Sequence, residues 1–253
     1  MTIDLKHLIR DMKIDPDKVQ LFLDGAVLVL EDLAPFEDGK LTPMEFLVQA
    51  ENDYDTGGQA ALLNSITNSR RAIQCQIDQW IRAFRFDASK NNKKKIEIIS
   101  ELGYAPRILR KVADARNLLE HDYKLPRIQE VEEALDLAWL FISVSREAPI
   151  PCRMYIVNED SRINVKKGSY NASIYQSGLV FELYDNKKPS RVVAFIIDEG
   201  SGFKEKKVAE AIIKNSDLVY LPLLKLMLAV EVNFDNRIDK AFSAFWNTIH
   251  SVK

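Results

Sequence analysis

The sequence predicts an α+β protein, with an all-helical region at residues 1–147 and a smaller α+β region with an antiparallel sheet at residues 150–253. Apolar residues recur at helical spacings of three and four through the first region. The Ala-Pro-Ile-Pro segment at 148–151 interrupts this pattern and marks a domain boundary. Beyond it, apolar stretches typical of strands flank a polar segment at 185–189, which favours a hairpin connection.

Capping signals and glycines predict the ends of the helices in the first region. Asp15 precedes a proline, which is typical of a helix start. Thr42 and Glu45 have the spacing of a capping box, and Gly57 predicts a break before a long helix. Gly103 is expected to close a short helix. The expected helices, which include an N-terminal helical extension over residues 1–45, are 15–33, 43–54, 59–84, 96–102, one from 106 to just past 123, and one from 126 to about 146.

The second region begins with strands and ends with helices. The β-rich segments are bounded by turn residues, as expected for short antiparallel strands. After the Gly-Ser-Gly segment at 200–202, helical spacing returns. The expected strands are 153–157, 161–166, 173–184 and 191–198, and the expected helices are 204–215, 218–232 and 237–249.

The composition is that of an ordinary globular protein without a strong charge. Of its 253 residues, 47% are hydrophobic and 28% are charged, and the net charge is -2. Contact with RNA or DNA would therefore depend on a local basic patch. No signal peptide and no apolar run of about 18 residues is found, so we expect a cytoplasmic protein without a membrane span. Cys75, in a helical pattern, is expected to be a small buried hydrophobe, which suits a reducing compartment.

An arginine, an amide, an imidazole and a phenol fall together at residues 116–123, Arg-Asn-Leu-Leu-Glu-His-Asp-Tyr. A histidine such as His121 can exchange a proton with the 2′-hydroxyl or the leaving oxygen of RNA. Arg116 can stabilise charge on phosphoryl oxygens through its planar guanidinium. Asn117 could orient the imidazole or hold a phosphate oxygen, and Tyr123 could bind a base or a phosphate. These residue types indicate cleavage of RNA without a metal.

Helical geometry places these residues on different faces. Asp114, Asn117 and His121 follow at i, i+3 and i+7 and share one face. Arg116 and His121 are five residues apart, which separates them by roughly 140° around a helix. An alternative is a surface pair between Arg116 and Glu120, with the histidine partly buried at the helix end. The spacing suits a helix end that faces a second copy of the chain, which predicts a homodimer.

The stretch 116–123 resembles the signature of the HEPN family, in which an arginine and a polar residue precede a histidine that is often followed by x-Tyr. The resemblance extends over roughly residues 45–147 and leaves residues 150–253 without an assigned role. It implies a helical bundle that usually dimerises and, in many members, acts as a metal-independent endoribonuclease in toxin or defence systems.

The resemblance also implies roles for single residues. Arg116 and His121 would be catalytic, with Asn117 as a supporting polar residue beside Asp114. Tyr123 would be a possible target of a nucleotidyltransferase-type antitoxin. No metal or other cofactor is implied. Some HEPN members have lost activity and serve as interaction domains, and the minimal toxins lack the N- and C-terminal additions seen here.

A second group of basic residues could contact RNA or phosphate, although a solvated surface is the ordinary explanation of such residues. A non-catalytic interaction module and a nucleotide-binding module therefore remain alternatives to a nuclease. His7 and His250 have no cysteine or histidine at ligand spacing, so no metal site is expected. The possible RNA-binding or phosphate-binding residues are Arg70, Arg71, Lys93, Lys94 and Lys95.

Overall fold

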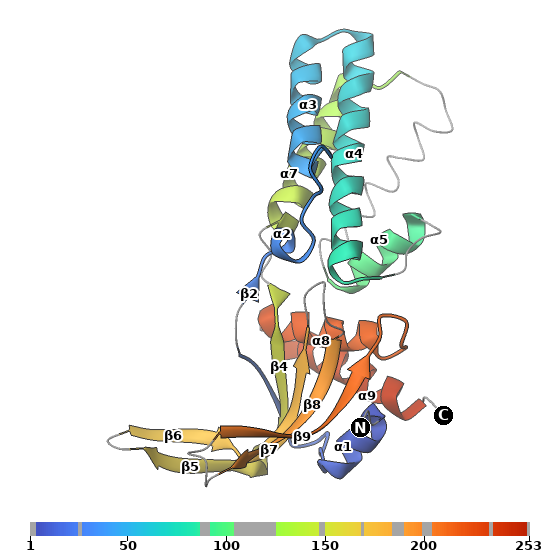
Figure 1. Ribbon diagram of the computed structural model, residues 1–253. Helices are drawn as coiled ribbons and strands as arrows, with labels where there is room; N and C mark the ends of the chain where they lie inside the picture. Colours follow the sequence, from blue (N-terminus) through green and yellow to red (C-terminus); the bar gives the residue numbers. More distant parts are fainter. Residues whose placement is uncertain are drawn as a thin grey trace. The chain divides into compact units, whose positions relative to one another are not determined.

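A computed structural model describes the fold (Figure 1). The described residues are 4–24, 27–86, 92–103, 125–146, 150–167, 170–183, 190–198, 204–232 and 235–251. The chain divides into two compact units, termed the sheet unit (Met1–Leu28 and Ile150–Lys253) and the helical unit (Val29–Pro149). The chain thus leaves the sheet unit, builds the helical unit and returns. No helix in the described part of the chain is long and apolar enough to cross a membrane.

The helical unit contains helices α2 (Leu30–Leu33), α3 (Pro43–Thr56), α4 (Gln59–Ala83), α5 (Asn92–Glu101) and α7 (Ile128–Arg146). The predicted capping box at Thr42 is confirmed: its hydroxyl accepts a hydrogen bond from the Glu45 amide at 3.2 Å, and the Glu45 carboxylate accepts one from the Thr42 amide at 2.7 Å. Gly57 and Gly58 separate α3 from α4 with φ angles of 70° and 85°, a backbone conformation that favours glycine. Local sequence signals therefore set these helix boundaries.

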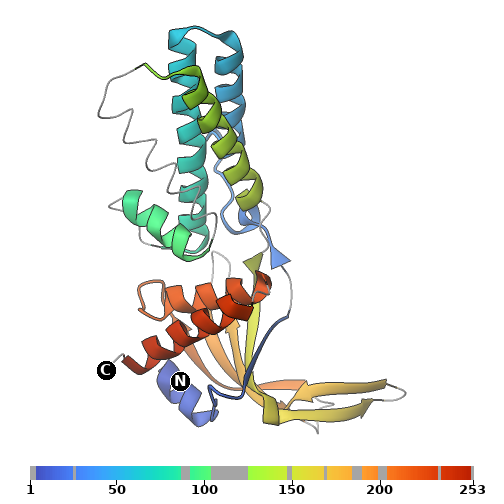
Figure 2. The same cartoon turned by 180° about the vertical axis from the view of Figure 1, so that it is seen from behind.

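Three of these helices, α3, α4 and α7, pack together along their lengths (Figures 1 and 2). The apolar stripe of α4 is buried, and Trp80 is fully buried and stacks on Phe84 with 5.3 Å between ring centres. A hydrogen bond also joins α3 to α7, because the Tyr54 hydroxyl donates to the Glu132 carboxylate at 2.6 Å. The helical unit is thus held by an apolar interior and by polar contacts at its surface.

The sheet unit is built on an antiparallel sheet with strand order β1-β4-β7-β8-β9. Its strands are β1 (Val19–Leu23), β4 (Arg153–Asn158), β7 (Ser177–Glu182), β8 (Ser190–Asp198) and β9 (Lys204–Ile213). Two short ladders accompany it, β2 (Val27–Leu28) with β3 (Ile150–Pro151), and β5 (Arg162–Lys167) with β6 (Tyr170–Tyr175). Helices α8 (Tyr220–Val232) and α9 (Asp235–Ser251) lie across one face (Figures 1 and 2). The α+β class and the antiparallel sheet are thus as predicted.

The expected helix at 15–33 is wrong over residues 15–28, which contain a turn and the strands β1 and β2, whereas 30–33 form α2. The expected N-terminal helical extension over 1–45 is thus helical only in part, at Leu5–Asp11 and Leu30–Leu33 and from Pro43 on. Asp15, expected to start a helix, instead lies in a turn. Its side chain accepts a hydrogen bond from the Asp17 amide at 3.1 Å. The chain then forms β1, whose pairing with β4 draws residues 1–28 into the sheet unit. The predicted first domain, 1–147, therefore loses its N-terminal part, although its C-terminal boundary lies close to Pro149.

The expected helix at 204–215 is also wrong, because this segment forms β9. Its lysines, glutamate and alanines favour a helix locally. Pairing with β8 along the strand overrides that preference. Buried and exposed side chains alternate at the end of β9, where Ala211 and Ile213 are buried and Ile212 is 39% exposed. The expected strand at 173–184 is divided instead into β6 and β7.

The sheet curls strongly, so that side chains of its second strand, β4, and its last strand, β9, come into contact. The Tyr155 hydroxyl on β4 donates to Glu205 Oε1 on β9 at 2.6 Å, although two strands stand between them in the sheet. A register shift interrupts the β8–β9 ladder at Phe195. Gly178 pairs with Phe195, and a Cβ at this glycine would lie 2.6 Å from Val157 Cγ1. The absence of a side chain at Gly178 therefore lets β7 pack closely against its neighbours β4 and β8.

Tyr155 gives the fold a pH dependence at alkaline pH. Burial, followed by the hydrogen bond to Glu205 and the charge of that carboxylate, raises the pKa of Tyr155 above its usual value. A raised folded-state pKa stabilises the fold fully below the unfolded-state pKa of about 10, and this stabilisation is lost as the pH rises above it. The difference in unfolding free energy between the wild type and Tyr155→Phe should be constant near neutral pH and change above about pH 10. A difference that stays constant across the alkaline range would contradict this assignment.

Candidate functional site

The motif predicted to be catalytic, 116–123, lies within residues 104–124, which are outside the part of the chain that the structure describes. This applies to Asp114, Arg116, Asn117, His121 and Tyr123, and to the helix expected from residue 106. Their mutual geometry therefore stays a prediction. By chain position the motif belongs to the helical unit, between α5 and α7.

The second predicted group lies on two helices, with Arg70 and Arg71 on α4 and with Lys93, Lys94 and Lys95 in the first half of α5. Arg71 Nη1 donates to Asn68 Oδ1 at 3.4 Å. Lys95 Nζ lies 2.9 Å from Asp78 Oδ1, and its side chain is only 20% exposed. Lys95 thus joins α5 to α4. The side chains of Lys93 and Lys94 lie outside the described part, and the phosphate-binding role of the group stays a prediction.

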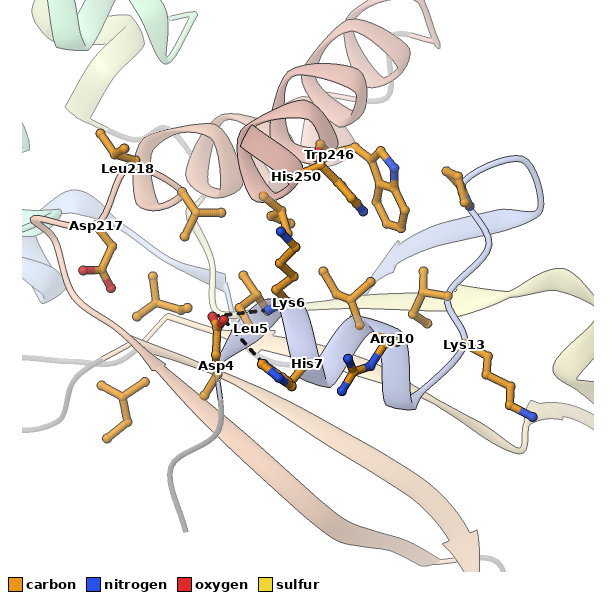
Figure 3. Close-up of a pocket in the computed structure, with 18 of the residues that line it drawn as sticks. Asp4, Leu5, Lys6, His7, Arg10, Lys13, Asp217, Leu218, Trp246 and His250 are labelled. Atoms are coloured by element: carbon orange, nitrogen blue, oxygen red, sulfur yellow. Dashed lines mark hydrogen bonds and ion pairs between the residues drawn. The ribbon is translucent and has the colours of Figure 1, made fainter. Parts of the chain in front are cut away.

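The sheet unit contains a groove that sequence patterns do not predict, with a volume of about 1110 Å³ (Figure 3). It lies among helix α1 (Leu5–Asp11), the end of β9 and the end of α9. Asp4 caps the N-terminus of α1, and its carboxylate accepts a hydrogen bond from the Lys6 amide at 3.4 Å. Leu5 and Ile9 bury the inner side of α1 and leave its charged residues exposed along the groove.

Both histidines of the described residues line this groove, although they lie near opposite ends of the chain. His7 Nδ1 is 3.6 Å from Asp4 Oδ2. His250 Nδ1 is 2.8 Å from the Trp246 carbonyl oxygen, and the His250 and Trp246 ring centres are 4.8 Å apart. In Figure 3 the His250 ring lies on the α9 side, whereas the His7 ring lies on the other side of α1. The two imidazoles therefore do not form a paired acid and base.

The charged residues of the groove nearly balance. Three basic side chains, Lys6, Arg10 and Lys13, line it together with three carboxylates, Asp4, Asp15 and Asp217. Arg10 Nε is 3.5 Å from the neighbouring Asp11. Within the described ranges, no three histidine, cysteine, aspartate or glutamate side chains gather where they could hold a metal ion. The groove thus combines balanced charges with the indole of Trp246, and its two described histidines do not form a paired acid and base.

Comparisons with known proteins give no relative for the chain. No family model matches the sequence, and no significant match was found among curated proteins or solved structures. The resemblance to HEPN proteins therefore depends on the residues at 116–123 and on the helical pattern around them. The residues that sequence reasoning missed, such as His7 and Trp246, carry no local signal, because only the tertiary fold brings the two ends of the chain together.

Proposed function

We propose that this chain is a metal-independent endoribonuclease of the HEPN type. The observation that carries the proposal is the set Arg116, Asn117, His121 and Tyr123, at the spacing of the HEPN signature. Support comes from its context, because the motif belongs to a unit whose described elements are helices, and α3, α4 and α7 pack side by side. The proposed active form is a homodimer, which would supply two copies of each residue to one cleft.

In the proposed reaction, a neutral His121 accepts the proton of a 2′-hydroxyl as that oxygen attacks the adjacent phosphorus. The bond from phosphorus to the 5′-oxygen breaks, and a protonated His121 from the second copy donates a proton to the leaving oxygen. Arg116 stabilises the negative charge that develops on the phosphoryl oxygens. The products are a 2′,3′-cyclic phosphate and a 5′-hydroxyl. In this proposal Tyr123 contacts the RNA and is the site that a nucleotidyltransferase-type antitoxin would modify.

The direct test is incubation of the purified full chain with RNA in excess EDTA. Cleavage that leaves cyclic phosphate ends is expected, and DNA of the same sequence should remain intact because it lacks the attacking 2′-hydroxyl. Loss of cleavage on chelation, or cleavage of DNA at an equal rate, would contradict the proposed chemistry.

A second candidate is a non-catalytic nucleotide-binding or interaction module, which the groove beside Trp246 favours. A half-buried indole can stack on a base, while basic groups nearby contact phosphates. If this is the function, one nucleotide of a panel should raise the melting temperature of the protein, and Trp246→Leu should remove the increase. A panel without any increase would discard this candidate.

A further inference from the structure

The sheet unit contains a second pocket of about 580 Å³, separate from the groove beside α1. It opens where the curled sheet approaches the β5–β6 hairpin, which extends from one end of the sheet (Figure 1). Its volume falls within the range of small-molecule sites. The residues that line it are Gln20, Leu21, Phe22, Asp24, Tyr155, Ser173, Ile174, Tyr175, Phe195, Ile197 and Glu205.

Aromatic rings form the inner wall of this pocket. Phe22 lies between Tyr155 and Tyr175, with ring centres 4.8 Å and 5.5 Å apart and small interplanar angles. Phe195 meets Tyr155 edge to face at 5.5 Å. Tyr175 is fixed because its hydroxyl bonds to Gln20. The wall is therefore rigid, and the negative faces of such rings attract cations.

The charged residues of the pocket have an excess of negative charge. Asp24 and Glu205 are acidic, and none of the described residues that line the pocket is basic. Arg153, at the rim, approaches both carboxylates, at 3.8 Å from Asp24 and 3.2 Å from Glu205. It also lies 3.4 Å from Glu182, but Glu182 is paired with Arg191 at 2.6 Å. Two pocket carboxylates thus share one guanidinium, and Asp24 remains 61% exposed.

The pocket already contacts a cation of the chain itself. The guanidinium carbon of Arg153 lies 5.2 Å from the centre of the Tyr155 ring, within the range of a cation–π contact. A phosphate group would meet the exposed carboxylate of Asp24 and would be repelled. A cationic group would gain the carboxylate and contact with Phe22 and Tyr175, the two rings that are only half-buried. Charge therefore selects against nucleotides and in favour of organic cations.

We propose that this pocket binds a small organic cation of the quaternary ammonium class, with the ammonium group against the aromatic wall and near Asp24. This inference is independent of the proposed nuclease function, because every residue that it uses lies in the sheet unit.

Choline is a suitable probe, and 3,3-dimethylbutan-1-ol is its neutral counterpart of nearly the same shape. Isothermal titration calorimetry of the full chain should show saturable binding of choline and binding of the neutral alcohol that is weaker by about tenfold or more. Asp24→Asn should weaken choline binding by a similar factor. Because Asp24 is exposed, this variant should fold normally, and a melting curve checks that it does.

The control is Glu37→Gln, which removes one exposed carboxylate of the helical unit and should leave choline binding unchanged. The proposal is overturned if choline gives no saturable heat, if the neutral alcohol binds equally well, or if Asp24→Asn binds choline like the wild type. Phe22→Leu tests the wall separately and should also weaken binding. None of these outcomes depends on RNA cleavage, so the pocket and the nuclease can fail independently.

Discussion

His121→Ala is expected to lower the rate of RNA cleavage in EDTA by about 10²- to 10⁴-fold, the range typical of a lost general acid or base. Arg116→Ala should have an effect of similar size, because charge on the phosphoryl oxygens would lose its guanidinium partner. Cleavage rates on a defined RNA measure both changes. Equal cleavage by the wild type and both variants would end the nuclease proposal.

Two control substitutions show whether a loss of cleavage is specific to Arg116 and His121. His250→Ala removes a histidine of the sheet unit, and Arg127→Ala removes an arginine that is 78% exposed and paired with Glu130. Both should cleave at the wild-type rate. Mixing the wild type with the His121→Ala protein tests the dimer, because the proposed reaction needs one His121 from each copy and a mixed dimer should be as slow as the variant. Activity that falls only in proportion to the wild-type fraction, in a mixture shown to exchange subunits, would contradict a cleft shared between copies.

Gly178→Ala is expected to destabilise the sheet unit by about 3 kcal/mol, at the upper end for overpacking a core. The new Cβ would lie 2.6 Å from Val157 Cγ1, 2.9 Å from the Ile156 carbonyl oxygen and 3.1 Å from Phe195 Cε1. One of these neighbours is backbone, so a side-chain rotation alone cannot relieve the clash. Hydrogen exchange of the amides in β7 and β8 measures the local loss of stability.

Gly103→Ala separates steric crowding from backbone strain. Gly103 has a φ angle of 94°, but a Cβ there would meet nothing within 4 Å. That substitution should therefore cost only about 1–2 kcal/mol of conformational strain and leave exchange in β7 and β8 unchanged. If Gly178→Ala also leaves these strands unchanged, the close approach of the curled sheet at Gly178 is not a constraint on the fold.

Elements with strong local signals could be predicted from the sequence. The capping box at Thr42 and the glycines after α3 are short-range features, and they set boundaries without help from the rest of the chain. The apolar stripe that includes Trp80 and Ile81 likewise identifies α4 as one long helix. Strands β4 and β8 were recognised because their β-branched and aromatic residues are dense and turn residues bound them.

Elements that depend on distant partners could not be predicted. β1 is a strand because β4, more than a hundred residues later in the chain, pairs with it. β9 has the composition of a helix and is a strand because β8 lies beside it. The same reason hides the groove, since nothing near His7 in the sequence indicates that Trp246 will line the same groove. The predicted motif at 116–123 is local in sequence, but its proposed cleft depends on a second copy.

The route of the chain through its two units has a consequence for synthesis on the ribosome. Leu28 and Ile150, where the chain leaves and re-enters the sheet unit, are cross-strand partners in the β2–β3 ladder. The helices between them pack on one another and can form while the nascent chain is still growing. Strand β1 is translated before these helices but has to wait unpaired for β4 to emerge. Strand β1 is therefore made before the helical unit and becomes native after it.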